Sequence, residues 1–185
     1  GKCDGHAIND AGTQLVSGVL AAMLHPKPKT AFIVGLGTGE TPGWLAEVPS
    51  IERVDVVELE PAIDEMARLC SDVNHDVLDH RKVQMIYNDA REVLLTIPTR
   101  YDLIFSEPSN PWRAGIANLF TREFYLSCRD RLNDDGLFVQ WVQGYEIAAQ
   151  TVQTGCATLR SVFGHVEIWQ SKAEDMLMVC SRRPN

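Results

Sequence analysis

The sequence contains no apolar run of about twenty residues, the length that a helix needs to cross a bilayer. It also has no excess of basic residues, because 17 lysines and arginines stand against 25 aspartates and glutamates, for a formal net charge of -8. Nucleic-acid binding depends on basic side chains that neutralise phosphates, so we expect no nucleic-acid partner. We also expect no signal peptide before the domain. We therefore expect a cytoplasmic location and no direct membrane contact by these residues.

Several kinds of reactive centre are also missing. The five cysteines are odd in number and widely spaced, without a Cys-x-x-Cys pair, which predicts reduced thiols rather than a disulfide framework. His75 and His80 flank Asp76 and Asp79, but the segment is typical of an exposed helix or loop, in which these ligands would not converge. We therefore predict no metal site. No serine stands in a nucleophile elbow, and no histidine-cysteine pair suggests covalent catalysis.

What is present is an alternation of helical and extended patterns over 185 residues, 45% of them hydrophobic, enough for one compact domain. We expect the first strand at the start of residues 31–39. The other expected strands cover 54–59, 83–87, 101–106, 136–142, 166–170 and 176–181. One expected helix ends near His25 and a second begins near Pro61. Two further helices are expected over 121–132 and 147–162. We predict an α/β fold with a doubly wound, mostly parallel seven-stranded sheet and an antiparallel C-terminal hairpin.

The stretch most indicative of function is residues 31–39, an apolar strand that breaks into glycines at Gly35, Gly37 and Gly39. Glycines let the backbone turn sharply and approach a ligand closely, and the amides of the next helix would face that ligand. The dinucleotide fingerprint has another glycine three places after its second, but Glu40 stands there, where a pyrophosphate would sit. The loop therefore predicts a nucleoside cofactor without phosphates.

The expected strand 54–59 ends in acidic residues about twenty positions after the glycine loop. Together, this strand end and the loop resemble those of class I S-adenosylmethionine-dependent transferases. The resemblance implies that Glu58 accepts from the ribose hydroxyls and that Asp89 accepts from the adenine amine. The other cofactor-binding residues that it implies are Gln14, Gly35, Gly37, Thr38, Gly39, Leu59 and Ala90. Simpler interpretations stay open: Glu58 as a first-turn acid favoured by the helix dipole, and Asp89 as a helix cap.

A second group of motifs narrows the resemblance to one family. Residues 101–111 resemble the spermidine synthase motif in which an aspartate, two small residues and a second aspartate precede proline, and the two acids correspond here to Glu107 and Asn110. The likeness continues in 118–125, in 132–140 and in Asp10 with Thr13 and Gln14. The chain resembles the spermidine synthase-like domain that some bacterial membrane proteins carry fused to transmembrane segments, so the domain would then be the cytosolic part of a larger membrane protein.

The resemblance implies polyamine biosynthesis, by transfer of an aminopropyl group from decarboxylated S-adenosylmethionine to an amine such as putrescine, without a metal. An alkylammonium with a pKa near about 10 has no lone pair at neutral pH, so a carboxylate must take its proton. We expect Glu107 to be this catalytic base, with Glu107, Asn110 and Tyr145 binding the amine. In the simpler interpretation, Glu107 before Pro108 only shapes a loop.

Departures from the family pattern leave alternatives open. Thr38 stands where spermidine synthases have an aspartate, and Asn110 removes the second acid. The N-terminal β-strand domain, which in the family covers the substrate and forms a homodimer, is almost absent, so residues 1–30 would be its remnant with one helix, and 31–185 the nucleoside-binding catalytic domain. The alternatives are a methyltransferase that uses intact S-adenosylmethionine on an amine or small molecule, and a catalytically reduced nucleoside-binding domain.

Overall fold

The computed structural model describes residues 11–108, 115–143, 148–172 and 175–183. Two of the predicted substrate-binding residues, Asn110 and Tyr145, lie outside these ranges. Gln14 lies in the first helix, and its side chain is also outside the described part of the chain. The predictions for these three residues therefore stay predictions.

The described residues form a seven-stranded sheet in the order β3-β2-β1-β4-β5-β7-β6. The strands are β1 (Thr30–Val34), β2 (Arg53–Glu58), β3 (Val83–Tyr87), β4 (Tyr101–Ser106), β5 (Leu132–Gln143), β6 (His165–Lys172) and β7 (Asp175–Ser181). The first five run parallel, and β7 pairs antiparallel with both β5 and β6. The predicted fold class, including the C-terminal hairpin, is confirmed.

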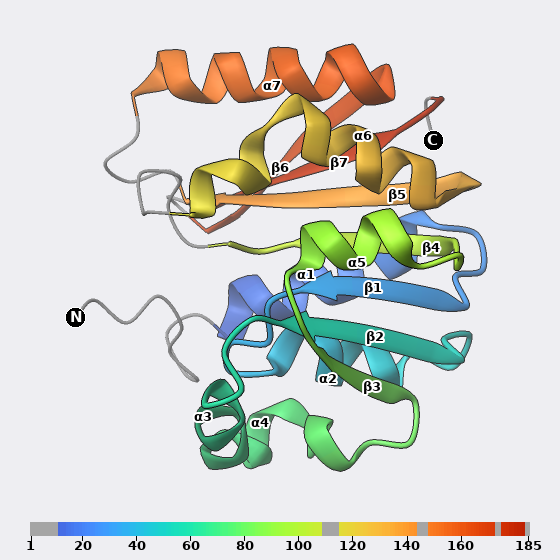
Figure 1. Ribbon diagram of the computed structural model, residues 1–185, viewed down its shortest axis with the longest axis vertical. Coiled ribbons are helices and arrows are strands. Elements are labelled where there is room, and N and C mark those ends of the chain that lie inside the picture. The colour runs from blue at the N-terminus through green and yellow to red at the C-terminus, as the bar shows by residue number, and fades with distance from the viewer. Residues whose placement is uncertain (1–10, 109–114, 144–147, 173–174, 184–185) are drawn as a thin grey trace.

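Helices cover both faces of the sheet (Figure 1). They are α1 (Ala11–Leu24), α2 (Glu40–Glu47), α3 (Ile63–Leu69), α4 (Ser71–Asn74), α5 (Ala90–Thr96), α6 (Arg122–Arg131) and α7 (Ala149–Phe163), with 3-10 turns η1 (Val77–Asp79) and η2 (Ile116–Phe120). Buried apolar side chains of α5, α6 and α7 pack on one face of the strands, and those of α1 and α2 pack on the other. The run Ala31 to Val34 contributes to both layers, which explains its continuous apolar character.

Most element boundaries lie within two residues of the sequence prediction, and the start of the fifth strand differs by four. The helix expected from Pro61 begins at Ile63, because residues 60–62 form a turn in which the Ile63 N–H donates to the Glu60 carbonyl. The fifth strand begins at Leu132 instead of Gly136, because Leu132 already pairs with Tyr101 across a register irregularity. Because that irregular stretch contains polar residues, hydrophobic periodicity did not indicate that the strand begins at Leu132.

Asp102 joins three strands at the edge of the sheet where the parallel strands begin. Its Oδ2 accepts hydrogen bonds from the backbone N–H groups of Lys29 and Thr30, at 2.7 and 3.0 Å, and its Oδ1 accepts from Asn133 Nδ2 at 2.6 Å. Burial raises the pKa of Asp102, but the hydrogen bonds from Asn133, Lys29 and Thr30 outweigh it, and the pKa is lowered. The carboxylate therefore stabilises the folded chain in its ionised form.

We expect Asp102→Asn to lower the free energy of unfolding by about 1 to 3 kcal/mol at pH 7. Because the pKa of Asp102 is lower in the folded than in the unfolded chain, its contribution is present above the unfolded value of about 4 and is lost as the pH falls through the folded value. Urea unfolding at pH 7 and pH 3 measures this. The difference between wild type and variant should shrink on acidification, and a constant difference would refute the role of the charge.

Candidate functional site

The candidate site lies where the strand order of the sheet reverses. From β1 the chain moves outward to β2 and β3 on one side, and β4 then pairs with the other side of β1. Val34 pairs with both Val57 and Ser106, so the strands β1, β2 and β4 end at the same edge. Open α/β sheets bind ligands in the crevice outside such strand ends. The glycine loop follows β1 and Glu107 follows β4, so both flank this point.

The glycine loop has the backbone conformation that its sequence requires. Gly35, Gly37 and Gly39 have φ angles of 92°, 55° and 80°, all in the region that other residues rarely adopt. A Cβ atom added to Gly35 or Gly37 would meet no atom of the described residues within 4 Å. The loop therefore offers an open stretch of backbone that a ligand can approach closely.

Glu58, the last residue of β2, lies against this loop. Its Oε2 accepts a hydrogen bond from the Leu36 N–H at 2.9 Å, and its Oε1 accepts from the Glu60 N–H, also at 2.9 Å. Each oxygen has a second lone pair with which it can accept from a ligand hydroxyl. The first-turn interpretation is wrong, because α3 begins five residues later and its first-turn acids are Asp64 and Glu65.

The next strand end carries the predicted adenine-binding pair. Asp89 caps α5, with Oδ1 accepting from the Arg91 N–H at 2.9 Å. Its carboxylate also pairs with the Arg91 guanidinium, and the side-chain hydrogen bonds from Arg91 are the main cause of its lowered pKa. Ala90 is buried and Leu59, at the adjacent strand end, is 73% exposed. The capping role of Asp89 is thus observed, and its adenine contact stays a prediction.

Glu107 is joined to the helix that follows the glycine loop. Thr41, in the first turn of α2, donates from Oγ1 to Glu107 Oε2 over 2.8 Å, and its side chain is buried. This bond connects the acid after β4 with the loop after β1, across the point where the strand order reverses. The sequence alone did not indicate Thr41, because nothing local to the glycine loop shows which distant acid its hydroxyl will meet.

Gln140 supports the same strand end from β5. It is fully buried, and its Nε2 donates at 3.1 Å to the carbonyls of both Ser106 and Trp141. The Ser106 carbonyl belongs to the peptide that leads into Glu107, so Gln140 fixes the direction in which the strand ends. A glutamine within an otherwise apolar run was the signal in the sequence, but it did not reveal the partner.

If Glu107 is the predicted catalytic base, we expect Thr41→Val to lower the reaction rate by about tenfold, because the carboxylate loses the donor that orients it. Valine has nearly the same volume as threonine, so the fold should persist. Thr41→Ser retains the hydroxyl and should keep most of the rate. Steady-state kinetics of both variants measure this, and equal rates in wild type and Thr41→Val would show that the bond is dispensable.

A group of potential metal ligands occurs at the opposite edge of the sheet. Ligand atoms of His25, Asp102 and Asp135 lie within 4.8 Å of one another. The His25 Nδ1 accepts from the Lys27 N–H at 3.2 Å, so in the neutral ring Nε2 carries the proton and offers no lone pair to a metal. Asp102 already accepts from three residues. We interpret this group as structural.

Comparison with solved structures shows the fold that this chain shares with known proteins. The Thermotoga maritima spermidine synthase structure superimposes with a TM-score of 0.80 at 20% identity, covering 94% of this chain and 60% of that one. Human methyltransferase-like protein 13 in complex with SAH superimposes with a TM-score of 0.69 at 19% identity, covering 94% and 80%. The chain has the Rossmann-like fold of the class I methyltransferases.

Sequence comparison then gives the family. The model of the spermine/spermidine synthase domain matches residues 14–172, and the chain belongs to that family. A polyamine aminopropyltransferase of Clostridium perfringens (strain SM101 / Type A) is 27% identical over 149 residues, which is 80% of this chain and 52% of that protein. The chain thus spans about half the length of the curated relatives that it matches. Among the described helices, none is long and apolar enough to span a membrane.

Proposed function

We propose that the chain transfers an aminopropyl group from decarboxylated S-adenosylmethionine to a small-molecule amine such as putrescine. The observation that supports this most is the bond between Thr41 and Glu107, which holds a carboxylate beside the glycine loop at the point where the strand order reverses. Family membership supports the same reaction class. In this proposal, the open glycine loop and Glu58 bind the nucleoside, and Glu107 faces the amine.

The chemistry assigns a distinct task to each of these groups. The protonated amine gives its proton to Glu107, and the freed lone pair attacks the aminopropyl carbon next to the sulfonium. A carbon–nitrogen bond forms, the carbon–sulfur bond breaks, and its electron pair stays on sulfur, which leaves as the neutral thioether methylthioadenosine. Donor and acceptor must lie in line for this displacement, so a carboxylate fixed by Thr41 positions the amine as well as deprotonating it.

The charges around the loop favour a donor without a carboxylate. Glu40 is 1% exposed, and Thr38 Oγ1 donates to its Oε1 over 3.5 Å. With Glu58 and Glu107, three carboxylates surround the loop after β1. Like charges at close range repel, so the carboxylate of an intact donor tail would be disfavoured there, whereas an ammonium would be attracted. Glu40 thus places a carboxyl group beside the threonine that replaces the family aspartate.

Calorimetric titration with S-adenosylmethionine, its decarboxylated form and methylthioadenosine tests the proposal. We expect the decarboxylated donor to bind at least about tenfold more tightly than the intact one, since an unfavourable charge contact is removed. Preference for the intact donor would instead support methyl transfer. Binding of any of these nucleosides without turnover in the presence of amines would support the catalytically reduced domain.

A further inference from the structure

One buried side chain, that of Asn74, connects the glycine loop to α3 and η1. Asn74, the last residue of α4, is 1% exposed, and its Nδ2 donates to the Thr38 carbonyl at 2.8 Å and to the Ala67 carbonyl at 2.7 Å. Its Oδ1 accepts from the Val77 N–H at 3.4 Å. Both amide protons are therefore used, one on the glycine loop and one on α3.

Asn74 and Val77 pack closely against the glycine loop and the first turn of α2. A Cβ on Gly39 would lie 2.6 Å from Val77 Cγ1 and 3.1 Å from Asn74 Nδ2. A Cβ on Gly43, one turn further along α2, would lie 2.0 Å from the Asn74 carbonyl oxygen. Glycines at these two positions let residues 74–77 pack directly against the loop and the first turn of α2, so the position of Asn74 determines where the loop can lie.

The backbone after Asn74 is strained. His75 and Asp76 have φ angles of 57° and 50°, which are unfavourable for residues other than glycine. The His75 ring packs edge-on against Trp44 of α2, with centroids 4.3 Å apart. Strain of this kind persists only where the surroundings impose it, and here the contacts of Asn74 and His75 with α2 and the loop impose it.

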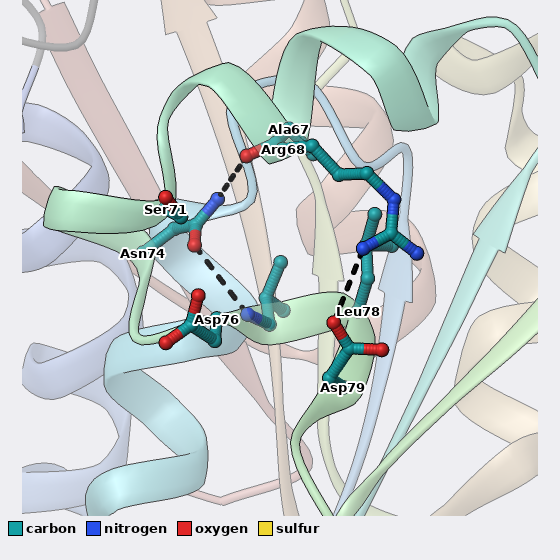
Figure 2. Close-up of a pocket in the computed structure, with 8 residues that line it drawn as sticks. Ala67, Arg68, Ser71, Asn74, Asp76, Leu78 and Asp79 are labelled. Carbon is teal, nitrogen blue, oxygen red and sulfur yellow. Dashed lines mark hydrogen bonds and ion pairs between the residues drawn. The ribbon is translucent and has the colours of Figure 1, made fainter.

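On its other side, Asn74 borders a cavity of about 190 Å³, which Ala67, Arg68, Ser71 and Asp79 also line. Figure 2 shows the Asn74 amide bridging from the α3 side of this cavity to the turn that carries Leu78. An ion pair between Arg68 and Asp79, at 3.1 Å, spans the outer side, but both side chains are largely exposed and such pairs contribute little. The fixed connection between α3, the loop and η1 is therefore the Asn74 amide.

We propose that Asn74 is a positioning residue for the nucleoside site. By holding the Thr38 carbonyl, it keeps the flanking Gly37 and Gly39 in the left-handed conformations that present the loop backbone to the ligand. The inference rests on the proposed function insofar as the ligand is an adenosyl nucleoside. It adds a residue 36 positions away from the loop that sets nucleoside affinity without touching the nucleoside.

Asn74→Asp tests this, because ionised aspartate has the same shape as asparagine but no proton to donate to the Thr38 carbonyl. Asn74→Ser keeps one donor and serves as the conservative variant. Tyr101→Phe is the matched control: it removes the 2.7 Å hydrogen bond from the Tyr101 hydroxyl to the buried Asp55, a comparable loss on the other face of the sheet. Two readouts are used, affinity for methylthioadenosine by calorimetry and amide hydrogen exchange of the unliganded chain.

We expect Asn74→Asp to weaken methylthioadenosine binding by about tenfold or more, Asn74→Ser by less, and Tyr101→Phe by less than about twofold. In the exchange experiment, the Leu36 and Gly39 amides, bonded to Glu58 and to the Leu36 carbonyl, should exchange faster in the Asn74 variants than in Tyr101→Phe. If Asn74→Asp does not fold, Asn74→Ser gives the same comparison.

The two proposals can fail separately. A wild-type chain that binds none of the nucleosides would refute the proposed function, and loop exchange would still decide whether Asn74 positions the loop. A wild-type chain that binds, together with unchanged affinity and unchanged loop exchange in the Asn74 variants, would overturn the role of Asn74 alone.

Discussion

Glu107→Gln should reduce aminopropyl transfer by about a hundredfold or more, because glutamine has the size of glutamate but cannot accept the proton of the ammonium. Its amide oxygen can still accept the hydrogen bond of Thr41, so the strand end and the loop should keep their arrangement. Donor affinity should therefore stay within about threefold of wild type. Steady-state rates and calorimetry on the same preparation separate these two quantities.

Glu52→Gln is the control for this experiment. Glu52 is also an acid, but it lies before β2 at the opposite edge of the sheet, where it pairs with Lys29 at 2.9 Å. Its loss should leave transfer unchanged. Turnover that survives in Glu107→Gln would remove this carboxylate from the mechanism, and the loop-shaping interpretation of Glu107 and Pro108 would then be favoured.

Gly43→Ala should have the largest effect on stability, a loss of about 3 kcal/mol or more. Its Cβ would lie 2.0 Å from the oxygen and 2.7 Å from the carbonyl carbon of Asn74, and backbone atoms cannot move aside as the end of a flexible side chain can. Helices α2 and α4 would have to separate. Urea unfolding monitored by circular dichroism measures the change.

Gly155→Ala provides the opposite case in the same assay. Gly155 lies within α7, and a Cβ there would meet no atom of the described residues within 4 Å. Alanine is the better helix former, so this variant should be more stable by about 0.5 to 1 kcal/mol. Equal effects of the two substitutions would show that the contact between Gly43 and Asn74 does not determine the packing of α2.

The sequence predicted those features of the site that depend on local patterns. The alternating glycines required positive φ angles, and Gly35, Gly37 and Gly39 have them. The alternation of helix and strand signals gave the parallel sheet, and the rule for strand ends then placed Glu58 and Glu107 at one edge. Asp89 was expected either at a helix cap or at adenine, and its local bond to Arg91 confirms the cap.

The supporting contacts could not be predicted in this way. Thr41 and Glu107 are 66 residues apart, Gln140 and Ser106 are 34 apart, and Asn74 and Thr38 are 36 apart. Hydrophobic periodicity assigns a residue to a face of the sheet, but it does not show which polar atom on another element a buried amide or hydroxyl will meet. The groups proposed to face the ligand could therefore be predicted from the sequence, whereas the groups that hold them were found only in the structure.

Product analysis tests the central claim most directly. The chain is incubated with decarboxylated S-adenosylmethionine and putrescine, and mass spectrometry quantifies methylthioadenosine and the aminopropylated amine. If the carboxylate held by Thr41 directs the displacement at the sulfonium, the two products should appear in equal amounts and decrease together in Glu107→Gln. A methylated amine formed from intact S-adenosylmethionine, or no product from a chain that binds the donor, would contradict this account.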